Sequence, residues 1–160
     1  MDNIYIICID DQREVLNALE NDLSEFDELI EIETCESGEE ALELINEIEV
    51  EGDHIAILVS DQVMPNMSGV ELLKKIESDG IFKHTQKILL TGLATHQDTI
   101  DAINSAALNH YIQKPWNSNN LNKIIKQSLT RFLLKAGIDY TPYLSVLDQE
   151  TLYQLIRKNT

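Results

Sequence analysis

The chain of 160 residues is poor in the residues that mark several classes of protein. It has 6 glycines and 3 prolines, too few for a disordered or collagen-like chain. Its 2 cysteines, Cys8 and Cys35, both lie in apolar, strand-like runs, which favours buried free thiols over a disulfide or a metal site. It has no recognisable signal peptide and no apolar run long enough to span a bilayer. We therefore expect a soluble cytoplasmic protein without a membrane partner.

Basic residues are also scarce, with 12 Lys and Arg against 28 Asp and Glu and a formal net charge of −16. Such a surface repels phosphate backbones, so we expect no direct binding to nucleic acid. The acidity does not identify a partner, because a solvated acidic surface also keeps a protein soluble. Hydrophobic residues make up 43% of the chain, which suits one core in one domain with a short extension.

Short apolar runs alternate with longer amphipathic stretches along the chain. Each short run has the length of a strand, and each long stretch has apolar residues at helical spacing. Two stretches begin at capping boxes, Ser37 to Glu40 and Ser68 to Glu71. This alternation predicts a doubly wound α/β fold around a five-stranded parallel sheet. The expected strands are 4–9, 30–35, 55–59, 88–90 and 111–112, and the expected helices are 15–26, 37–48, 68–76, 95–107 and 117–134.

Polar side chains stand where four of the five predicted strands end. Asp10 and Asp11 follow the first strand, Asp61 follows the third, Thr91 the fourth and Lys114 the fifth. In open α/β sheets, ligands bind beyond the carboxyl ends of the strands, so these side chains should surround one crevice. Three carboxylates there would repel one another, and an all-oxygen cluster suits a hard cation such as Mg²⁺. The lysine would face an incoming phosphoryl group, and the threonine would offer it a hydrogen bond.

Each of these residues also has an ordinary structural interpretation. A single Asp after a strand is most often a turn residue or a helix cap, so Asp10 or Asp11 could cap the first helix. Thr91 alone is less informative still, and Lys114 could be an ordinary exposed lysine. A binding site is favoured because all of them fall at the same edge of a parallel sheet.

Several short motifs occur in the order and at the strand ends typical of one family. They are Asp10-Asp11, the segment 35–42, Asp61 with Met64-Pro65 and Gly69, Thr91-Gly92, and Tyr111 with Lys114-Pro115. Together they resemble the receiver domains of two-component response regulators over about Asn3 to Leu134. The resemblance implies a flavodoxin-like sheet with strand order 2-1-3-4-5 and a receiver domain at 1–134. Residues 135–160 would then be a helical tail or the start of a linker to an output domain.

The resemblance also implies the chemistry of the acidic residues. Asp61 would be the phosphoacceptor, taking its phosphoryl group from a sensor histidine kinase or a phosphotransfer protein. Asp11, Asp61 and the main-chain carbonyl of Val63 would bind Mg²⁺ directly, and Asp10 would act mainly through a coordinated water. The chain would catalyse only its own phosphorylation and dephosphorylation, so we do not expect an enzyme acting on a separate substrate.

The remaining matched residues imply a switch. Thr91 and Lys114 would bind the phosphoryl oxygens, and a cis peptide bond between Lys114 and Pro115 would aim the lysine into the site. Tyr111 would change rotamer as Thr91 moves, and so reshape the face from Ala94 to Lys114. That face would contact a second copy of the chain or a downstream effector domain.

Alternatives remain open for the function and for the tail. A magnesium-dependent aspartyl-phosphate phosphatase usually needs a second carboxylate two residues after the nucleophile, where Val63 stands. A pseudo-receiver scaffold would not need the intact acidic cluster, and a nucleotide-binding domain would have a glycine-rich loop after the first strand. In the tail, Leu152, Leu155 and Ile156 follow Asp148 at helical spacing. This predicted helix could pack on its own domain, pair with another copy or begin a linker.

Overall fold

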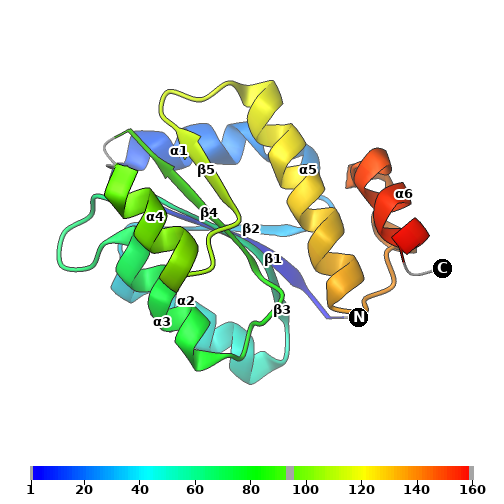
Figure 1. Ribbon diagram of the computed structural model, residues 1–160, viewed down its shortest axis with the longest axis horizontal. Coiled ribbons are helices and arrows are strands. Elements are labelled where there is room, and N and C mark those ends of the chain that lie inside the picture. The colour runs from blue at the N-terminus through cyan, green and yellow to red at the C-terminus, as the bar shows by residue number, and fades with distance from the viewer. Residues whose placement is uncertain (1, 93–95, 159–160) are drawn as a thin grey trace.

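The computed structural model describes residues 2–92 and 96–158. Five parallel strands form one sheet in the order β2-β1-β3-β4-β5, as Figure 1 shows. The predicted fold class and strand order are therefore confirmed, and the strands differ from their predicted bounds by at most two residues. They are β1 (Ile4–Ile9), β2 (Glu31–Cys35), β3 (His54–Ser60), β4 (Gln86–Thr91) and β5 (His110–Gln113).

Helices cover both faces of this sheet (Figure 1). On one face lie α1 (Arg13–Asp22) and α5 (Ser118–Lys135), and on the other lie α2 (Gly38–Glu51), α3 (Gly69–Asp79) and α4 (His96–Ser105). Side chains of a strand alternate between the faces, so β1 contributes Ile6 and Cys8 to one core and Ile7 and Ile9 to the other. The expected start of the fourth helix, Thr95, lies outside the described residues.

Two of the predicted helix starts are confirmed by their caps. The hydroxyl of Ser37 accepts the N–H of Glu40 at 3.1 Å, and that of Ser68 accepts the N–H of Glu71 at 3.2 Å. The Glu40 carboxylate accepts the N–H of Glu36, one residue before the cap. Each cap satisfies an N–H group that has no partner within its helix.

The helix predicted over 15–26 is wrong in its length. The α-helix ends at Asp22, and a separate 3₁₀ turn covers Ser24–Phe26. Leu23 and Phe26 remain fully buried, because a spacing of three residues also places two side chains on one side of a 3₁₀ turn. The apolar spacing therefore identified the buried side chains correctly but could not distinguish the two kinds of helix.

The tail packs on its own domain. A 3₁₀ segment at Thr141–Val146, which the sequence did not predict, leads into α6 (Gln149–Lys158), the helix expected after Asp148. Thr130 on α5 accepts the N–H of Asp148 at 3.0 Å, and α6 lies beside α5 in Figure 1. The tail adds to the core on the α1 and α5 side the buried residues Tyr143, Val146, Leu147 and Leu152.

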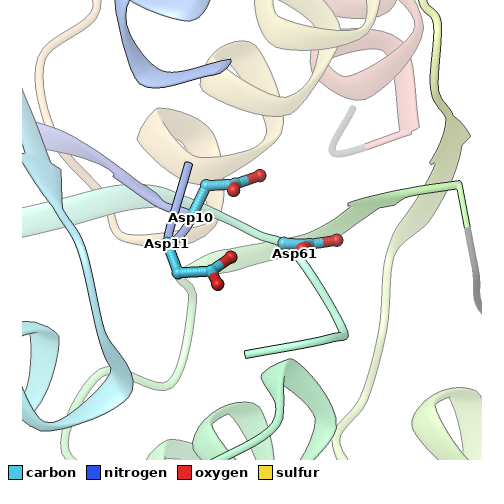
Figure 2. Close-up of side chains that lie close together, drawn as sticks. All are labelled: Asp10, Asp11 and Asp61. Atoms are coloured by element: carbon cyan, nitrogen blue, oxygen red, sulfur yellow. The ribbon is translucent and has the colours of Figure 1, made fainter. Parts of the chain in front are cut away.

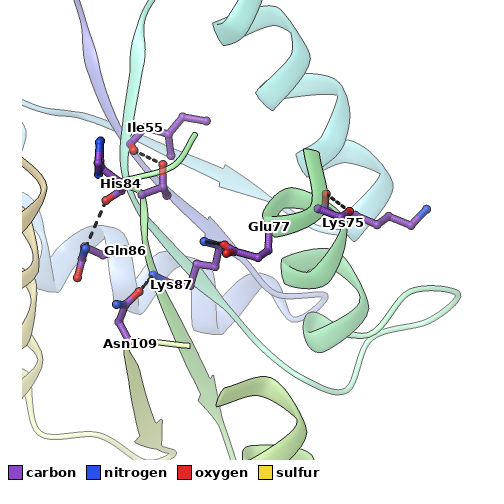
Figure 3. A network of polar contacts seen from close by, with 9 residues as sticks. Ile55, Lys75, Glu77, His84, Gln86, Lys87 and Asn109 are labelled. Carbon is purple, nitrogen blue, oxygen red and sulfur yellow. Dashed lines mark hydrogen bonds and ion pairs between the residues drawn. The ribbon is translucent and has the colours of Figure 1, made fainter. Parts of the chain in front are cut away.

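A polar network holds the amino end of β4, as Figure 3 shows. The Lys87 ammonium, on a side chain only 2% exposed, lies 2.8 Å from the carboxylate of Glu77 on α3. Asn109 accepts the N–H of Lys87 with its side chain at 2.7 Å and donates its own N–H to the Lys87 carbonyl at 2.8 Å. The hydroxyl of Thr85 donates to the carbonyl of Ile55 on β3 at 2.6 Å. The strand is thus tied to α3, to β3 and to the segment before β5.

None of the helices within the described residues is both long and apolar enough to cross a membrane.

Candidate functional site

The polar residues predicted at the strand ends gather at one edge of the sheet. Asp10 and Asp11 follow β1, Asp61 follows β3, Thr91 ends β4 and Lys114 follows β5. Carboxylate oxygens of the three aspartates all lie within 4.8 Å of one another, and Figure 2 shows the three side chains together. They form the one cluster of three metal-ligating side chains found among the described residues. The crevice predicted from the parallel topology is therefore present.

Backbone contacts place Asp10 and Asp61 side by side. The N–H of Asp10 donates to the carbonyl of Cys35 at 3.1 Å, and the N–H of Asp61 donates to the carbonyl of Ile9 at 2.9 Å. These bonds continue the sheet by one residue beyond β1 and β3. The hydroxyl of Ser60 donates to the carbonyl of Asp61 at 2.9 Å, which holds the peptide that leaves the site.

Gly69 lets the start of α3 approach this peptide. A Cβ added at Gly69 would stand 2.1 Å from the carbonyl oxygen of Asp61, far inside van der Waals contact. The Gln62 side chain accepts the N–H of Val70 at 2.9 Å, and the Gln62 carbonyl accepts the N–H of Gly69 at 3.1 Å. The sequence marked Gly69 as part of a motif, but only the packing shows why a side chain cannot fit there.

Lys114 connects two of the carboxylates. Its ammonium lies 2.7 Å from Oδ2 of Asp10 and 3.6 Å from Oδ1 of Asp61. The backbone N–H of Lys114 donates to the carbonyl of Thr91 at 3.2 Å, and this bond holds the lysine next to the end of β4. The peptide bond between Lys114 and Pro115 is cis, as the resemblance implied.

The three carboxylates of the site differ in burial, and together they outnumber the one ammonium. Asp10 is 1% exposed and Asp61 is 7% exposed, whereas Asp11 is exposed. Burial raises the pKa of Asp10, and hydrogen bonds from Lys114 and from the N–H of Gln12 oppose that rise. Three carboxylates and one ammonium leave two negative charges in excess, which a divalent cation would neutralise. The oxygen-only donor set fits Mg²⁺, which prefers such ligands.

Asp10 also fulfils part of the ordinary role considered for it. Its Oδ1 accepts the N–H of Gln12 at 2.9 Å, which stabilises the turn before α1. The residue at the N-cap position is Gln12, so neither Asp10 nor Asp11 caps this helix in the usual way. The other carboxylate oxygen of Asp10 remains bound to Lys114, so the turn and the site share one side chain.

A cavity of about 280 Å³ opens beside the aspartates. Val63, 52% exposed, stands at its rim. The volume of the cavity leaves room for a group of phosphoryl size next to the acidic cluster. The residues that line it are Asp11, Gln12, Asp61, Val63, Thr91, Gly92 and Lys114.

Tyr111 does not lie in the core. Its side chain is 36% exposed, and its hydroxyl donates to the carbonyl of Thr91 at 3.4 Å. The ring of Tyr111 is therefore not a core side chain in this conformation. The partner face predicted from Ala94 to Lys114 begins at residues that lie outside the described ones.

Comparisons with known proteins agree with this geometry. Residues 6–126 match the family described as the response regulator receiver domain. The hydrogenase transcriptional regulatory protein HoxA of Bradyrhizobium diazoefficiens is 27% identical over 139 residues, which cover 84% of this chain and 27% of that protein. The chemotaxis protein CheY1 of Helicobacter pylori is 31% identical over 113 residues, which cover 69% of this chain and 85% of that protein. This chain thus spans about a quarter of the length of the HoxA relatives.

Solved structures support the same assignment. The CheY-like receiver domain protein of Methanospirillum hungatei is 26% identical with a TM-score of 0.70, and the match covers 84% of this chain and 99% of that one. The family match spans most of the chain, and the acidic cluster lies at the strand ends inside it. This chain therefore belongs to the response regulator receiver domain family, a family of signalling modules of two-component systems.

Proposed function

We propose that this receiver domain accepts a phosphoryl group on Asp61. The observation that carries the proposal is the arrangement of three carboxylates and one lysine around the cavity. Asp10 is buried and bonded to Lys114, whereas Asp61 lines the cavity and lies 3.6 Å from the same ammonium. Receiver domains generally have a kinase as partner, and the donor here would be a phosphohistidine of a sensor histidine kinase or a phosphotransfer protein.

An acidic triad of this kind is typical of the Mg²⁺ site in receiver domains. Asp11, Asp61 and the main-chain carbonyl of Val63 would hold the ion directly, and Asp10 would hold it through a water. When bound, Mg²⁺ would neutralise charge on the phosphoryl oxygens and on the carboxylates that face them. The fit is supported by the oxygen-only donor set and by the excess of two negative charges.

The transfer itself needs little chemistry from the protein. A carboxylate oxygen of Asp61 forms a bond to phosphorus while the bond from phosphorus to the imidazole nitrogen breaks, and that nitrogen keeps the electron pair. A carboxylate is itself a nucleophile, so no general base is required, and positioning carries the reaction. Lys114 and the hydroxyl of Thr91 would bind the phosphoryl oxygens. Hydrolysis of the acyl phosphate would return Asp61 and reset the domain.

The signal would leave through Thr91 and Tyr111. The hydroxyl of Tyr111 reaches the backbone carbonyl of Thr91, so a shift of the Thr91 backbone toward a phosphoryl group would change a contact of the ring. A ligand shifts such an equilibrium only by its difference in affinity for the two states. The bond from Thr91 to a phosphoryl oxygen, available in one state only, would supply that difference. The changed face would then bind a second copy or an effector domain.

Intact mass after treatment with phosphoramidate and Mg²⁺ tests the phosphoacceptor. We expect the mass of the wild-type protein to rise by one phosphoryl group. The Asp61→Asn variant should gain nothing, whereas Asp79→Asn, a matched change at an exposed residue of α3, should be labelled as fully as wild type. Equal labelling of the Asp61→Asn variant would show that another residue accepts the group.

A separate measurement decides between this function and a phosphatase. A phosphatase acting through Asp61 would turn over a phosphate monoester, and the side chain of Val63 offers no proton to a leaving group. We therefore expect no release of phosphate from a monoester such as p-nitrophenyl phosphate. Sustained turnover that is lost in the Asp61→Asn variant would favour the phosphatase.

A further inference from the structure

A hydrogen bond ties the loop after β5 to the end of helix α1. The indole N–H of Trp116 donates to Oδ2 of Asp22 at 2.7 Å, and the two residues are 94 positions apart in the chain. Both side chains are partly buried, and the Trp116 ring packs against the core on the α1 and α5 side. Trp116 stands two residues after Lys114, so this bond holds the loop that carries the lysine of the site.

Apart from this bond and the packing of the Trp116 ring, the loop of residues 114–117 is held at its ends within the described part of the chain, and at one end the Lys114 ammonium also contacts Asp10 and Asp61. At one end, the N–H of Lys114 donates to the carbonyl of Thr91. At the other end, the side chain of Asn117 accepts the N–H of Asn120 and caps α5. Pro115 has no N–H to donate. Between the two ends, the bond of Trp116 to Asp22 joins the loop to α1.

Asp22 lies at a position where a carboxylate does not stabilise its own helix. It is the last residue of α1, at the negative end of the helix dipole, and the last turn of α1 has no basic residue. The bond from Trp116 is charge-assisted and therefore offsets this unfavourable position. Asp22 thus contributes to the loop rather than to the helix that carries it.

We propose that Trp116 and Asp22 are positioning residues for Lys114, an inference that rests on the proposed phosphorylation of Asp61. The bond restricts the loop and so keeps the Lys114 ammonium beside Asp10 and Asp61, where an oxygen of the incoming phosphoryl group must lie. Without the bond, the lysine keeps its charge but occupies this position for less of the time. Transfer then slows, while the aspartates that would hold Mg²⁺ stay in place.

The rate of phosphorylation by phosphoramidate tests this proposal. Trp116→Phe keeps an aromatic ring but removes the donor, and Asp22→Ala removes the acceptor, so each should slow the reaction by about tenfold. Asp22→Asn should react nearly as fast as wild type, because its amide oxygen still accepts the bond. Glu20→Ala, which removes an exposed carboxylate from the same helix, should match wild type. Mg²⁺ affinity, measured by calorimetry, should be equal in all five proteins, which a general disturbance of the site would not allow.

A double-mutant cycle with Lys114→Ala separates positioning from a general loss of structure. In the Lys114→Ala protein, which should itself react slowly, Asp22→Ala should cause no further loss of rate. A further tenfold loss there, or a wild-type rate for both Trp116→Phe and Asp22→Ala, would overturn the proposal. Trp116→Phe keeps the test decisive even if Asp22→Ala does not fold. If the wild-type protein is not phosphorylated at Asp61 at all, the proposed function itself fails, and this inference fails with it.

Discussion

A buried lysine, Lys87, and a half-buried one, Lys114, lie at opposite ends of the central sheet, and the balance of charge around them differs. Lys87, at the amino end of β4, has one carboxylate partner, Glu77 at 2.8 Å. Asn109 makes hydrogen bonds to the backbone N–H and the carbonyl of Lys87. Lys114, beside the carboxyl end of β4, contacts Asp10 and Asp61, and it is the one ammonium beside a cluster of three aspartates. Charges balance at the first cluster and do not balance at the second.

The difference separates a structural ion pair from a binding site. A pair of opposite charges that cancel, with its hydrogen bonds satisfied, needs no further ligand. Removing one partner leaves the other charge without compensation. A cluster with two negative charges in excess is stabilised by an added cation instead. The same residue types thus serve the fold at one end of the sheet and are suited to ligand binding at the other.

The largest effect is expected from a change that disturbs the site without altering its charge. Gly69→Ala places a Cβ against the carbonyl oxygen of Asp61, and backbone cannot yield there cheaply. We expect a loss of about 3 kcal/mol in the free energy of unfolding together with slower phosphorylation, because Asp61 must move. Urea denaturation and intact mass measure the two effects. Gly92→Ala, whose Cβ would meet only ordinary contacts, is the control, and equal stability of the two variants would contradict the packing argument.

Breaking the balanced pair comes next. Glu77→Ala leaves the buried ammonium of Lys87 without its partner, and we expect the free energy of unfolding to fall by about 2 kcal/mol, less than for a fully buried pair because Glu77 is 44% exposed. Lys87→Met removes the charge but keeps the bulk, so it should cost about 1 kcal/mol at most. The rate of phosphorylation per folded molecule should not change in Glu77→Ala. A loss of rate without loss of stability would mean that this end of β4 also serves the site.

At the cluster of Asp10, Asp11 and Asp61, removing a carboxylate should stabilise the fold rather than destabilise it. In the presence of EDTA, Asp61→Asn should raise the free energy of unfolding by about 1 kcal/mol, because it removes repulsion from Asp10 and Asp11. Millimolar Mg²⁺ should stabilise the wild-type protein more than this variant, as seen in thermal denaturation. Destabilisation by Asp61→Asn in EDTA would show that the contact with Lys114 outweighs the repulsion.

The smallest effect concerns a carboxylate whose hydrogen-bond donors are neutral groups. Hydrogen bonds from the hydroxyl and N–H of Thr151 lower the pKa of Asp148 below its ordinary value of 3.8. An acid with a lowered pKa stabilises the folded state above its ordinary pKa, and this contribution is lost as the pH falls through the lowered value. Asp148→Asn should therefore cost about 0.5 kcal/mol between pH 5 and pH 8, and less below pH 4. A difference that grows on acidification would contradict this assignment.

The sequence alone determined the five strands, the starts of two helices and the location of the site. Helical and strand periodicities are local properties, so the apolar runs predicted the five strands, and two short polar motifs predicted the starts of α2 and α3. The site followed because parallel strands bring their carboxyl ends to one edge, which places Asp10, Asp61 and Lys114 together once the topology is known.

Only the tertiary structure decided which groups touch. It paired Lys114 with Asp10 more closely than with Asp61, and it joined Trp116 to Asp22 across 94 positions. It also showed that Gly69 meets the Asp61 carbonyl and that the tail packs on α5. Such contacts join residues far apart in the chain, and their distances depend on how whole elements pack, which periodicity and motif spacing do not encode.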